Sequence, residues 1–403
     1  MKQTLRILSL LALMGMCAVS ADAQQVRKSM LRLPDTGQTG DYSTVPGEDS
    51  DYPSMPMGFT VMGPVVRDTV TGLMWQRGDG GEMTWEQART YCDTLTLAGY
   101  TDWRLALAHE AFSIHDLSHG SPTLPEVFER TQAEYWWSSD TLIDDGRRVW
   151  STNAGGGIGP HPLTETISAG GTKRFHVRAV RDITEPQTLP SHFTELQDEI
   201  IIDHLTDRTW MQYCLAGTYT WEDALRAADT LNHAGFSDWR VPNMKELQSL
   251  SVRSMKMPTN DIRYFPCVMP TGTYWSSTTL VNKTFAQAWV MQTELGIATY
   301  ADKITEQRVL LVRGGDRLVS VEQDDAALYE RISDTLPFPN PTHGRVRFGG
   351  SHDIIRVYSP AGVELRSALS TDAIDLTGLA TGVYIVSLTN AYGPCKAFHV
   401  RKY

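Results

Sequence analysis

The chain has 403 residues, of which 41% are hydrophobic and 21% charged, and its formal net charge at pH 7 is −11. This composition is typical of globular domains, and the length is enough for two or three of them. The acidic balance argues against nucleic acid and anionic membranes as partners.

The N-terminus predicts export. Lys2 and Arg6 precede the short apolar run ILSLLALMGMCAV, and the small residues at 21–23 form a cleavage signal. We therefore expect a signal peptide at 1–23, and no other segment is long and apolar enough to span a bilayer. Residues 24–59 are poor in aliphatic side chains and rich in Asp, Ser, Thr, Gly and Pro, which predicts a flexible leader.

The next part of the chain contains the same motifs twice, in residues 60–182 (copy one) and 197–316 (copy two), with an expected linker at 183–196. Matching pairs are TWEQARTYCDTL and TWEDALRAADTL, AGYTDWR and AGFSDWR, and YWWSSDTL and TYWSSTTL. Trp103 and Trp239 lie 136 residues apart, as do Trp85 and Trp221. This constant offset indicates a duplicated domain.

The local patterns predict an α+β fold for each copy. Thr84 and Thr220 are suitable N-caps for helices that end near Gly99 and Gly235, and Pro242 opens a second helix in copy two. Short aromatic runs such as TYWSST and QAWVMQ predict strands in the later half.

The Asp-Trp-Arg motifs permit two interpretations. In an extended segment the tryptophan points away from the flanking Asp and Arg, so the indole can enter the core while the charged groups pair with backbone or with each other. The alternative is a surface clamp for a ligand, and we favour the structural role. The motif residues that we expect to be structural are Trp75, Trp85, Asp102, Trp103, Arg104, Trp137, Trp210, Trp221, Asp238, Trp239, Arg240 and Trp275.

No catalytic, cofactor or metal site is predicted. The serines of the two Trp-Ser-Ser stretches have no repeated histidine partner, and the Gly-x-Ser-x-Gly motif of serine hydrolases is absent. Cys92, Cys214, Cys267 and Cys395 follow the expected cleavage site and allow three full pairings. We favour a disulfide between Cys214 and Cys267, which lie within one copy.

The stretches in which the copies diverge are the candidate ligand-binding loops. Copy one has a glycine-rich stretch at 151–171 where copy two has a different sequence at 290–307. The alternative is a disordered connection from which residues 154–160 can be deleted without loss of folding. The candidate ligand-binding residues are Asn153, Gly155, Gly156, Gly157 and His161.

The repeated motifs resemble the C-terminal domain of the Legionella collagen-like protein family over roughly 60–182 and 197–316. This resemblance implies two tandem domains similar to C-type-lectin-like and formylglycine-generating-enzyme-like folds, found in exported adhesins. One branch of the family is associated with sulfated glycosaminoglycans, but the acidic charge of this chain argues against such a ligand. The family often pairs a helix cysteine with one near the last strand, and neither copy here has both cysteines.

The C-terminal stretches LPFPNPTHGRVRF, IRVYSPAGVEL, IDLTGLATGVYIVSL and KAFHVRKY resemble the type A sorting domain of type IX secretion in Bacteroidetes. The resemblance covers 336–403, after an expected linker at 317–335, and implies an antiparallel β-sandwich. It also implies recognition by the type IX secretion machinery, removal of the domain, and release or attachment at the cell surface.

From these features we expect a secreted or outer-membrane surface-attached, adhesin-like binding protein without enzymatic activity, whose partner is an extracellular glycan or protein. The alternative is a structural subunit of the surface or matrix. A further alternative is an enzyme related to formylglycine-generating enzymes.

Overall fold

The computed structural model describes residues 26–164, 167–168, 171–172, 175–197, 199–314, 345–359, 364–390 and 393–402. The expected signal peptide at 1–23, the expected linker at 317–335 and the start of the expected sorting domain, 336–344, lie outside these ranges. The chain divides into two compact units, Met1–Leu318 (unit one) and Val319–Tyr403 (unit two).

Each copy in unit one begins with an antiparallel meander. Copy one forms β2 (Phe59–Met62), β3 (Val65–Asp68) and β4 (Leu73–Gln76), and β12 (Ala179–Asp182) and β5 (Arg104–Leu105) complete its sheet. Copy two repeats this arrangement with β14 (Phe193–Leu196), β15 (Ile200–Asp203), β16 (Arg208–Met211) and β20 (Val312–Arg313).

Half of the stretch expected to be a linker, 183–196, is strand. It forms β13 (Gln187–Leu189), which pairs with β1 (Val26–Lys28), and β14, which opens copy two. Phe193 is buried and its backbone lies opposite Asp203 in β15, so core packing and strand pairing together order this segment.

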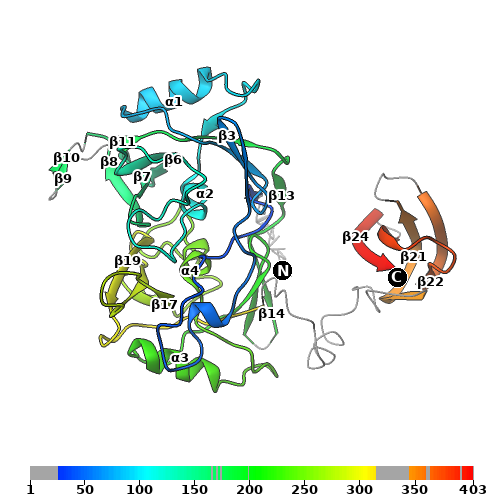
Figure 1. Ribbon diagram of the computed structural model, residues 1–403. Coiled ribbons are helices and arrows are strands. Elements are labelled where there is room, and N and C mark those ends of the chain that lie inside the picture. The colour runs from blue at the N-terminus through cyan, green and yellow to red at the C-terminus, as the bar shows by residue number, and fades with distance from the viewer. Residues whose placement is uncertain are drawn as a thin grey trace, which may run out of the picture. The chain divides into compact units, whose positions relative to one another are not determined.

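Four short helices follow the meanders. The Thr84 hydroxyl caps α1 (Trp85–Thr94) and the Thr220 hydroxyl caps α3 (Trp221–Asp229), each accepting a hydrogen bond from a backbone N–H three residues on. The second helices are α2 (Ala108–Ser113) and α4 (Met244–Ser249). Within unit one, α1 and α3 lie at opposite ends, and α2 and α4 lie near the middle in contact with each other (Figure 1).

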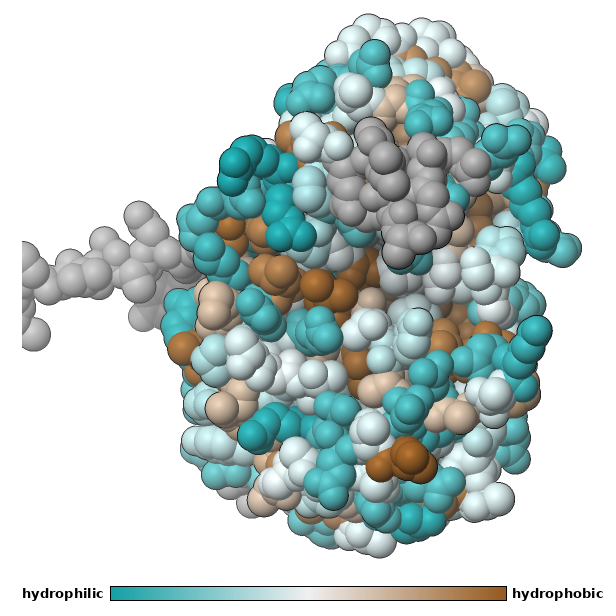
Figure 2. Space-filling model, turned by 90° about the vertical axis from the view of Figure 1, so that its left-hand side faces the viewer, coloured by the Kyte–Doolittle hydropathy of each residue, from teal (hydrophilic) through white to brown (hydrophobic). Residues whose placement is uncertain are grey.

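The two copies share one seven-stranded sheet. Its order is β11 (Phe175–His176), β6 (Tyr135–Leu142), β7 (Asp145–Asn153), β8 (Ile158–Pro162), β19 (Ile297–Asp302), β18 (Gln287–Gln292) and β17 (Thr273–Thr279). Copy one supplies the first four strands and copy two the last three, and they join where Ile158 lies opposite Ala298. On the surface on the side of β8 and β19, several apolar side chains gather near the middle, and others are scattered among polar ones (Figure 2).

Strands therefore predominate in unit one, although each copy also contains two helices. The helix-rich first half that we expected from the α+β pattern is instead a strand meander followed by helices of 10 and 6 residues in copy one. The remaining short elements of unit one are η1 (Asp49–Asp51), β9 (Ile167–Ser168) and β10 (Gly171–Thr172).

The prediction of a flexible leader is wrong for residues 26–58. This segment contacts both copies: the Gln38 amide donates to the carbonyl oxygens of Leu117 in copy one and Thr279 in copy two. Its buried polar side chains are Ser29, Asp35, Thr36, Gln38, Glu48, Asp49 and Ser54. The low aliphatic content misled the prediction, because this segment is held by buried hydrogen bonds more than by apolar packing.

Unit two is a single four-stranded antiparallel sheet in the described residues. Its order is β22 (Glu364–Asp375), β21 (Arg345–Tyr358), β23 (Gly382–Asn390) and β24 (Gly393–Lys402). The two sheets expected of a sandwich are not seen there, because runs that looked like separate strands join into long ones. In β21 the register shifts between Arg347 and His352, and the strand continues past this irregularity.

Candidate functional site

The aspartates of the two Asp-Trp-Arg motifs bind arginines on the last strand of their own copy. Asp102 accepts hydrogen bonds from Arg181 at 2.7 and 2.9 Å, and Asp238 accepts them from Arg313 at 2.7 and 3.2 Å. The partner is thus a strand arginine, not the arginine of the motif itself.

The arginine of each motif binds a helix-capping glutamate six residues further along. In copy one, Arg104 forms two hydrogen bonds with Glu110, at 2.7 and 2.8 Å, and also binds Asp182. Glu110 accepts the backbone N–H of Leu107 at the start of α2. The motif therefore connects a strand, a helix start and the last strand of the meander sheet.

Copy two builds the same network with the opposite charge balance. Arg240 forms two hydrogen bonds with Glu246, both at 2.7 Å, and Arg208 on β16 adds a third at 2.7 Å. Glu246 is fully buried. Burial alone would raise its pKa, but the two guanidinium groups hold it at about 2. Copy one has one arginine between two carboxylates, and copy two has one carboxylate between two arginines.

The predicted motif tryptophans lie in the cores, except that Trp85 is only partly buried. Two pairs of these indoles make the same N–H bonds in both copies. Trp85 and Trp221 donate to the carbonyl oxygens of Ser138 and Ser276. Trp137 and Trp275 likewise donate to backbone carbonyls near the helix starts. The fully buried members are Trp75, Trp103, Trp137, Trp210, Trp221, Trp239 and Trp275.

The glycine-rich candidate loop is a tight, packed turn between β7 and β8. The Asn153 side-chain oxygen accepts the backbone N–H groups of Gly155 and Gly157 at 2.9 and 3.1 Å. Gly156 has φ of +87°, and a Cβ there would lie 2.9 Å from the Leu117 side chain. The turn is therefore not a disordered connection, and it offers little exposed surface to a ligand.

The same geometry corrects two further expectations about this stretch. Deleting 154–160 would remove the buried Ile158, which joins the two copies, so folding would not survive unchanged. His161 is separate from the turn: it lies on β8 with its ring 4.9 Å from that of Tyr135 and 5.8 Å from that of Phe175.

The structure selects one cysteine pair. Cys214 and Cys267 form a disulfide with their Cα atoms 5.7 Å apart, and it packs beside the copy-two core. Cys92 is a free, buried cysteine, and burial raises the pKa of its thiol to about 12. Its reactive thiolate form is therefore disfavoured at neutral pH.

A candidate ligand site is a cavity of about 180 Å³ between the copies, which we name the central cavity. The leader, α2 and α4 enclose it, and its surface is mainly apolar. The lining residues are Val26, Arg27, Lys28, Ser29, Met30, Leu33, His109, Phe112, Ser113, His192, Leu205, Thr206, Lys245, Gln248, Ser249, Ser251 and Val252. A largely apolar cavity with a few polar groups is the usual form of a small-ligand site.

Two polar groups of the central cavity occupy equivalent positions in α2 and α4. His109 Nε2 and the Ser29 hydroxyl share a hydrogen bond of 2.8 Å, and burial lowers the pKa of His109. Lys245 donates to the carbonyl oxygens of Asp35 and Ser113, both at 2.7 Å, and burial lowers its pKa to about 8. Copy one thus contributes an imidazole to the lining of the cavity at the position where copy two contributes a buried ammonium group.

A third polar group lies at the edge of the cavity towards β15. His192 lies 3.2 Å from Asp203, a fully buried carboxylate that Thr206 also binds at 2.7 Å. Burial would raise the pKa of Asp203, but His192 and the hydrogen bonds lower it below its usual range.

Sequence reasoning missed this cavity because its parts are far apart in the chain. The alignment of the copies places His109 opposite Lys245, which was the one available signal, but it does not bring Ser29 or His192 to the same place. No group of three His, Cys, Asp or Glu side chains in the described ranges is positioned to hold a metal ion. No helix in those ranges is long and apolar enough to cross a membrane.

The model of one protein family, described as the Lcl C-terminal domain, matches the chain twice. The matched segments are 64–181 and 199–313, which together make up more than half of the chain. They coincide with the two structural repeats of unit one. A search of curated proteins finds no match.

Proposed function

Because the chain belongs to the Lcl C-terminal domain family and contains two tandem copies of that domain, we propose that it is an exported, adhesin-like binding protein. Its ligand is an extracellular glycan or protein group that enters the central cavity. Each copy is proposed to be C-type-lectin-like. The family supports a location on the cell surface or outside the cell.

The observation that carries the proposal is the central cavity, which both copies and the leader build together. Neither copy alone supplies its walls, so the cavity gives a reason for the tandem arrangement. Its volume of about 180 Å³ is below the usual range for whole drug-sized ligands, and suits one sugar ring or one side chain of a larger partner. Phe112 offers an apolar wall, and His109 and Ser29 offer hydrogen bonds.

Glycan-array binding by the full chain, with a blocked-cavity variant, tests this proposal. Val252→Trp should fill the cavity and abolish binding. Ile304→Trp adds the same side chain at a site 85% exposed and outside the cavity, so it should bind as the parent does. Equal binding by the two variants would exclude the cavity as the site. No binding to any glycan or matrix protein would favour the structural subunit instead.

One observation favours an enzyme as a second candidate: the Ser29 hydroxyl lies 2.8 Å from His109 Nε2 inside the cavity. A serine nucleophile also needs a group that orients the histidine, and no hydrogen bond to His109 Nδ1 is formed within the described ranges. Hydrolysis of ester substrates by the full chain, lost in Ser29→Ala, would establish this activity over simple binding.

We also propose that residues 1–23 and roughly 330–403 are removed during export through type IX secretion of a Bacteroidetes cell. The four-stranded antiparallel sheet of unit two is compatible with a sorting domain. Intact-mass measurement of protein from the medium or cell surface tests this. A mature species that retains Tyr403 would contradict it.

A further inference from the structure

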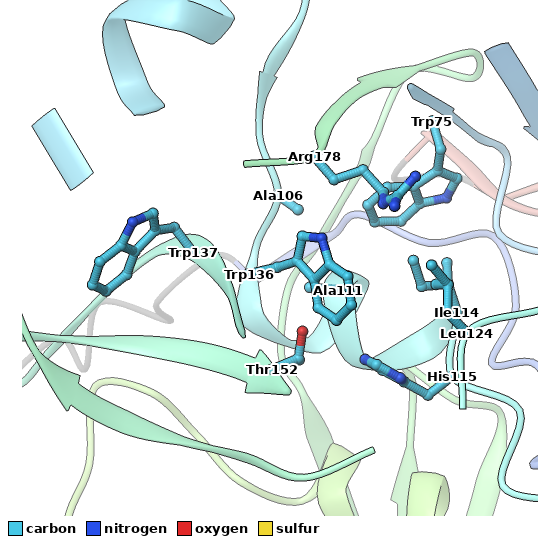
Figure 3. A pocket seen from close by; sticks show the side chains of 10 residues that line it. All are labelled: Trp75, Ala106, Ala111, Ile114, His115, Leu124, Trp136, Trp137, Thr152 and Arg178. Atoms are coloured by element: carbon cyan, nitrogen blue, oxygen red, sulfur yellow. The ribbon is translucent and has the colours of Figure 1, made fainter. Parts of the chain in front are cut away.

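A second, much smaller cavity lies inside copy one (Figure 3). Its lining side chains come from β4, α2, β6, β7 and the strand region before β12, and they are Trp75, Ala106, Ala111, Ile114, His115, Leu124, Trp136, Trp137, Thr152 and Arg178. The cavity has room for one particle of the size of a water molecule, because the centre of such a particle can move within about 10 Å³.

Three residues that line the cavity carry N–H donors without an acceptor among the described residues. Arg178 is only 3% exposed, and its Nη1 donates to the carbonyl oxygens of three consecutive residues, 76–78. Its Nε and Nη2 have no acceptor among the described residues, and neither do the indole nitrogens of Trp75 and Trp136. Buried donors are nearly always bonded, so this group requires an acceptor that the described part of the chain does not supply.

The charge of Arg178 is also unbalanced. Burial lowers its pKa to about 10, so the guanidinium stays protonated at neutral pH. The nearby carboxylates are used elsewhere: Asp79 lies 3.0 Å from His176, and Glu129 lies 4.0 Å from Arg77. Neither is within ion-pair distance of Arg178 in the described structure. The rings of Phe128 and Trp136, 5.0 and 5.9 Å from the guanidinium carbon, stabilise the cation only partly.

Copy two shows that the fold does not require an arginine here. Val180 and Val312 pair with the equivalent residues Trp75 and Trp210, so Arg178 corresponds to Leu310 two positions earlier. Leu310 is fully buried in an apolar cluster to which both copies contribute. The buried cation is therefore a feature of copy one alone. The unpaired indole N–H is not, because Trp210, which corresponds to Trp75, also has no acceptor for it among the described residues.

We propose that copy one binds one monovalent anion of about the size of a water molecule, a halide such as chloride, between Arg178 and the indole N–H groups of Trp75 and Trp136. A halide accepts several N–H donors at once and neutralises the guanidinium. A water molecule would accept from only some of them and would leave the charge unbalanced. The anion stabilises the folded form, because the unfolded chain does not assemble the site.

Chloride-dependent unfolding of the full chain tests the proposal. All 11 tryptophans lie between Trp75 and Trp289, so their fluorescence reports on unit one without a signal from unit two. Urea unfolding is followed in sodium chloride and sodium gluconate mixtures at constant ionic strength. At chloride concentrations above the dissociation constant of the bound anion, each tenfold rise in chloride concentration should lower the equilibrium constant for unfolding tenfold.

Arg178→Leu, which introduces the residue of copy two, should abolish this chloride dependence. Arg147→Leu, at a side chain 92% exposed, should leave it unchanged. Crystals of the unaltered chain grown with bromide give a second test that needs no variant to fold. A bromide anomalous peak in the cavity supports the proposal. A bound water without bromide, or unfolding that does not depend on chloride, overturns it.

Discussion

At the scale of single residues, the Asp-Trp-Arg motif acts through two separate ion pairs and one buried ring. In copy two, Asp238 holds Arg313 on the last strand, Arg240 holds Glu246 at the start of α4, and Trp239 fills the core. The three consecutive residues thus fix a strand, a helix and the core to one another. These contacts give the motif a structural role in both copies.

Trp239→Ala should lower the free energy of unfolding of unit one by about 3–5 kcal/mol, because a fully packed indole leaves a cavity when it is removed. Its N–H bond to the carbonyl of His233, 3.1 Å, is lost as well. Tyr300→Ala, at a side chain 53% exposed, should cost far less. Urea unfolding followed by circular dichroism compares the two. Equal stability of Trp239→Ala and the parent would contradict the role of Trp239 in core packing.

Glu246→Gln and Glu110→Gln should differ because their partners differ. Removing the charge of Glu246 leaves Arg208 and Arg240 buried together, and we expect a loss of about 3–5 kcal/mol at pH 7. Glu110→Gln leaves Arg104 with Asp182 as a partner, so the loss should be smaller. Urea unfolding of both variants measures the difference. A larger loss for Glu110→Gln would show that the two networks are not related as described.

At the scale of elements, the leader is held by buried carboxylates. Asp49 accepts the hydroxyls of Thr36 and Thr278 at 2.7 and 2.6 Å, and thereby connects the leader to β17. Burial, followed by repulsion from Asp35, raises the pKa of Asp49 to about 7. The folded protein consequently binds a proton here more tightly than the unfolded chain does.

The contribution of Asp49 to the stability of unit one should therefore fall as pH rises from about 4 to about 7, and it should change no further above that range. Asp49→Asn keeps a side-chain acceptor without the charge, so at pH 8 it should be more stable than the parent by about 2 kcal/mol. Urea unfolding at pH 5 and pH 8 measures this effect. The exposed Asp93→Asn should keep the pH dependence of the parent, and an unchanged slope in Asp49→Asn would refute the role of this carboxyl.

At the scale of the whole molecule, unit one is a pseudo-symmetric pair of domains that share a sheet and enclose a common cavity. The joint is the pairing of Ile158 with Ala298, both almost fully buried. Strands on either side of the joint belong to the same hydrogen-bonded network. The two copies should therefore unfold together.

Ala298→Asp should place an unpaired carboxylate in this joint and destabilise both copies. Hydrogen exchange read by mass spectrometry should show faster opening in β6 of copy one as well as in β17 of copy two. Thr299→Asp, at the neighbouring and more exposed position, is the control and should have a small effect. Loss of protection confined to β17–β19 would mean that the copies are independent domains.

Several local features of this protein follow from the sequence alone. The constant spacing of the motifs predicts two copies of one domain, and the family match places two domains over the same regions. The helix starts at Thr84 and Thr220 and the burial of the motif tryptophans follow from capping chemistry and side-chain size. These features depend on neighbouring residues and on whether a side chain is apolar, which the sequence displays directly.

Other features depend on residues that are far apart in the chain, and only the tertiary structure decides them. The polar leader is ordered because Asp35, Gln38 and Asp49 find partners about 200 residues away, which no local pattern reveals. The composition of residues 24–59 therefore gave the wrong expectation. The same holds for the central cavity and for Arg178, since burial and the lack of an acceptor are properties of the packed chain. The sequence determined the repeated unit, and the tertiary structure decided how the two units join and what they enclose, because joining depends on long-range contacts.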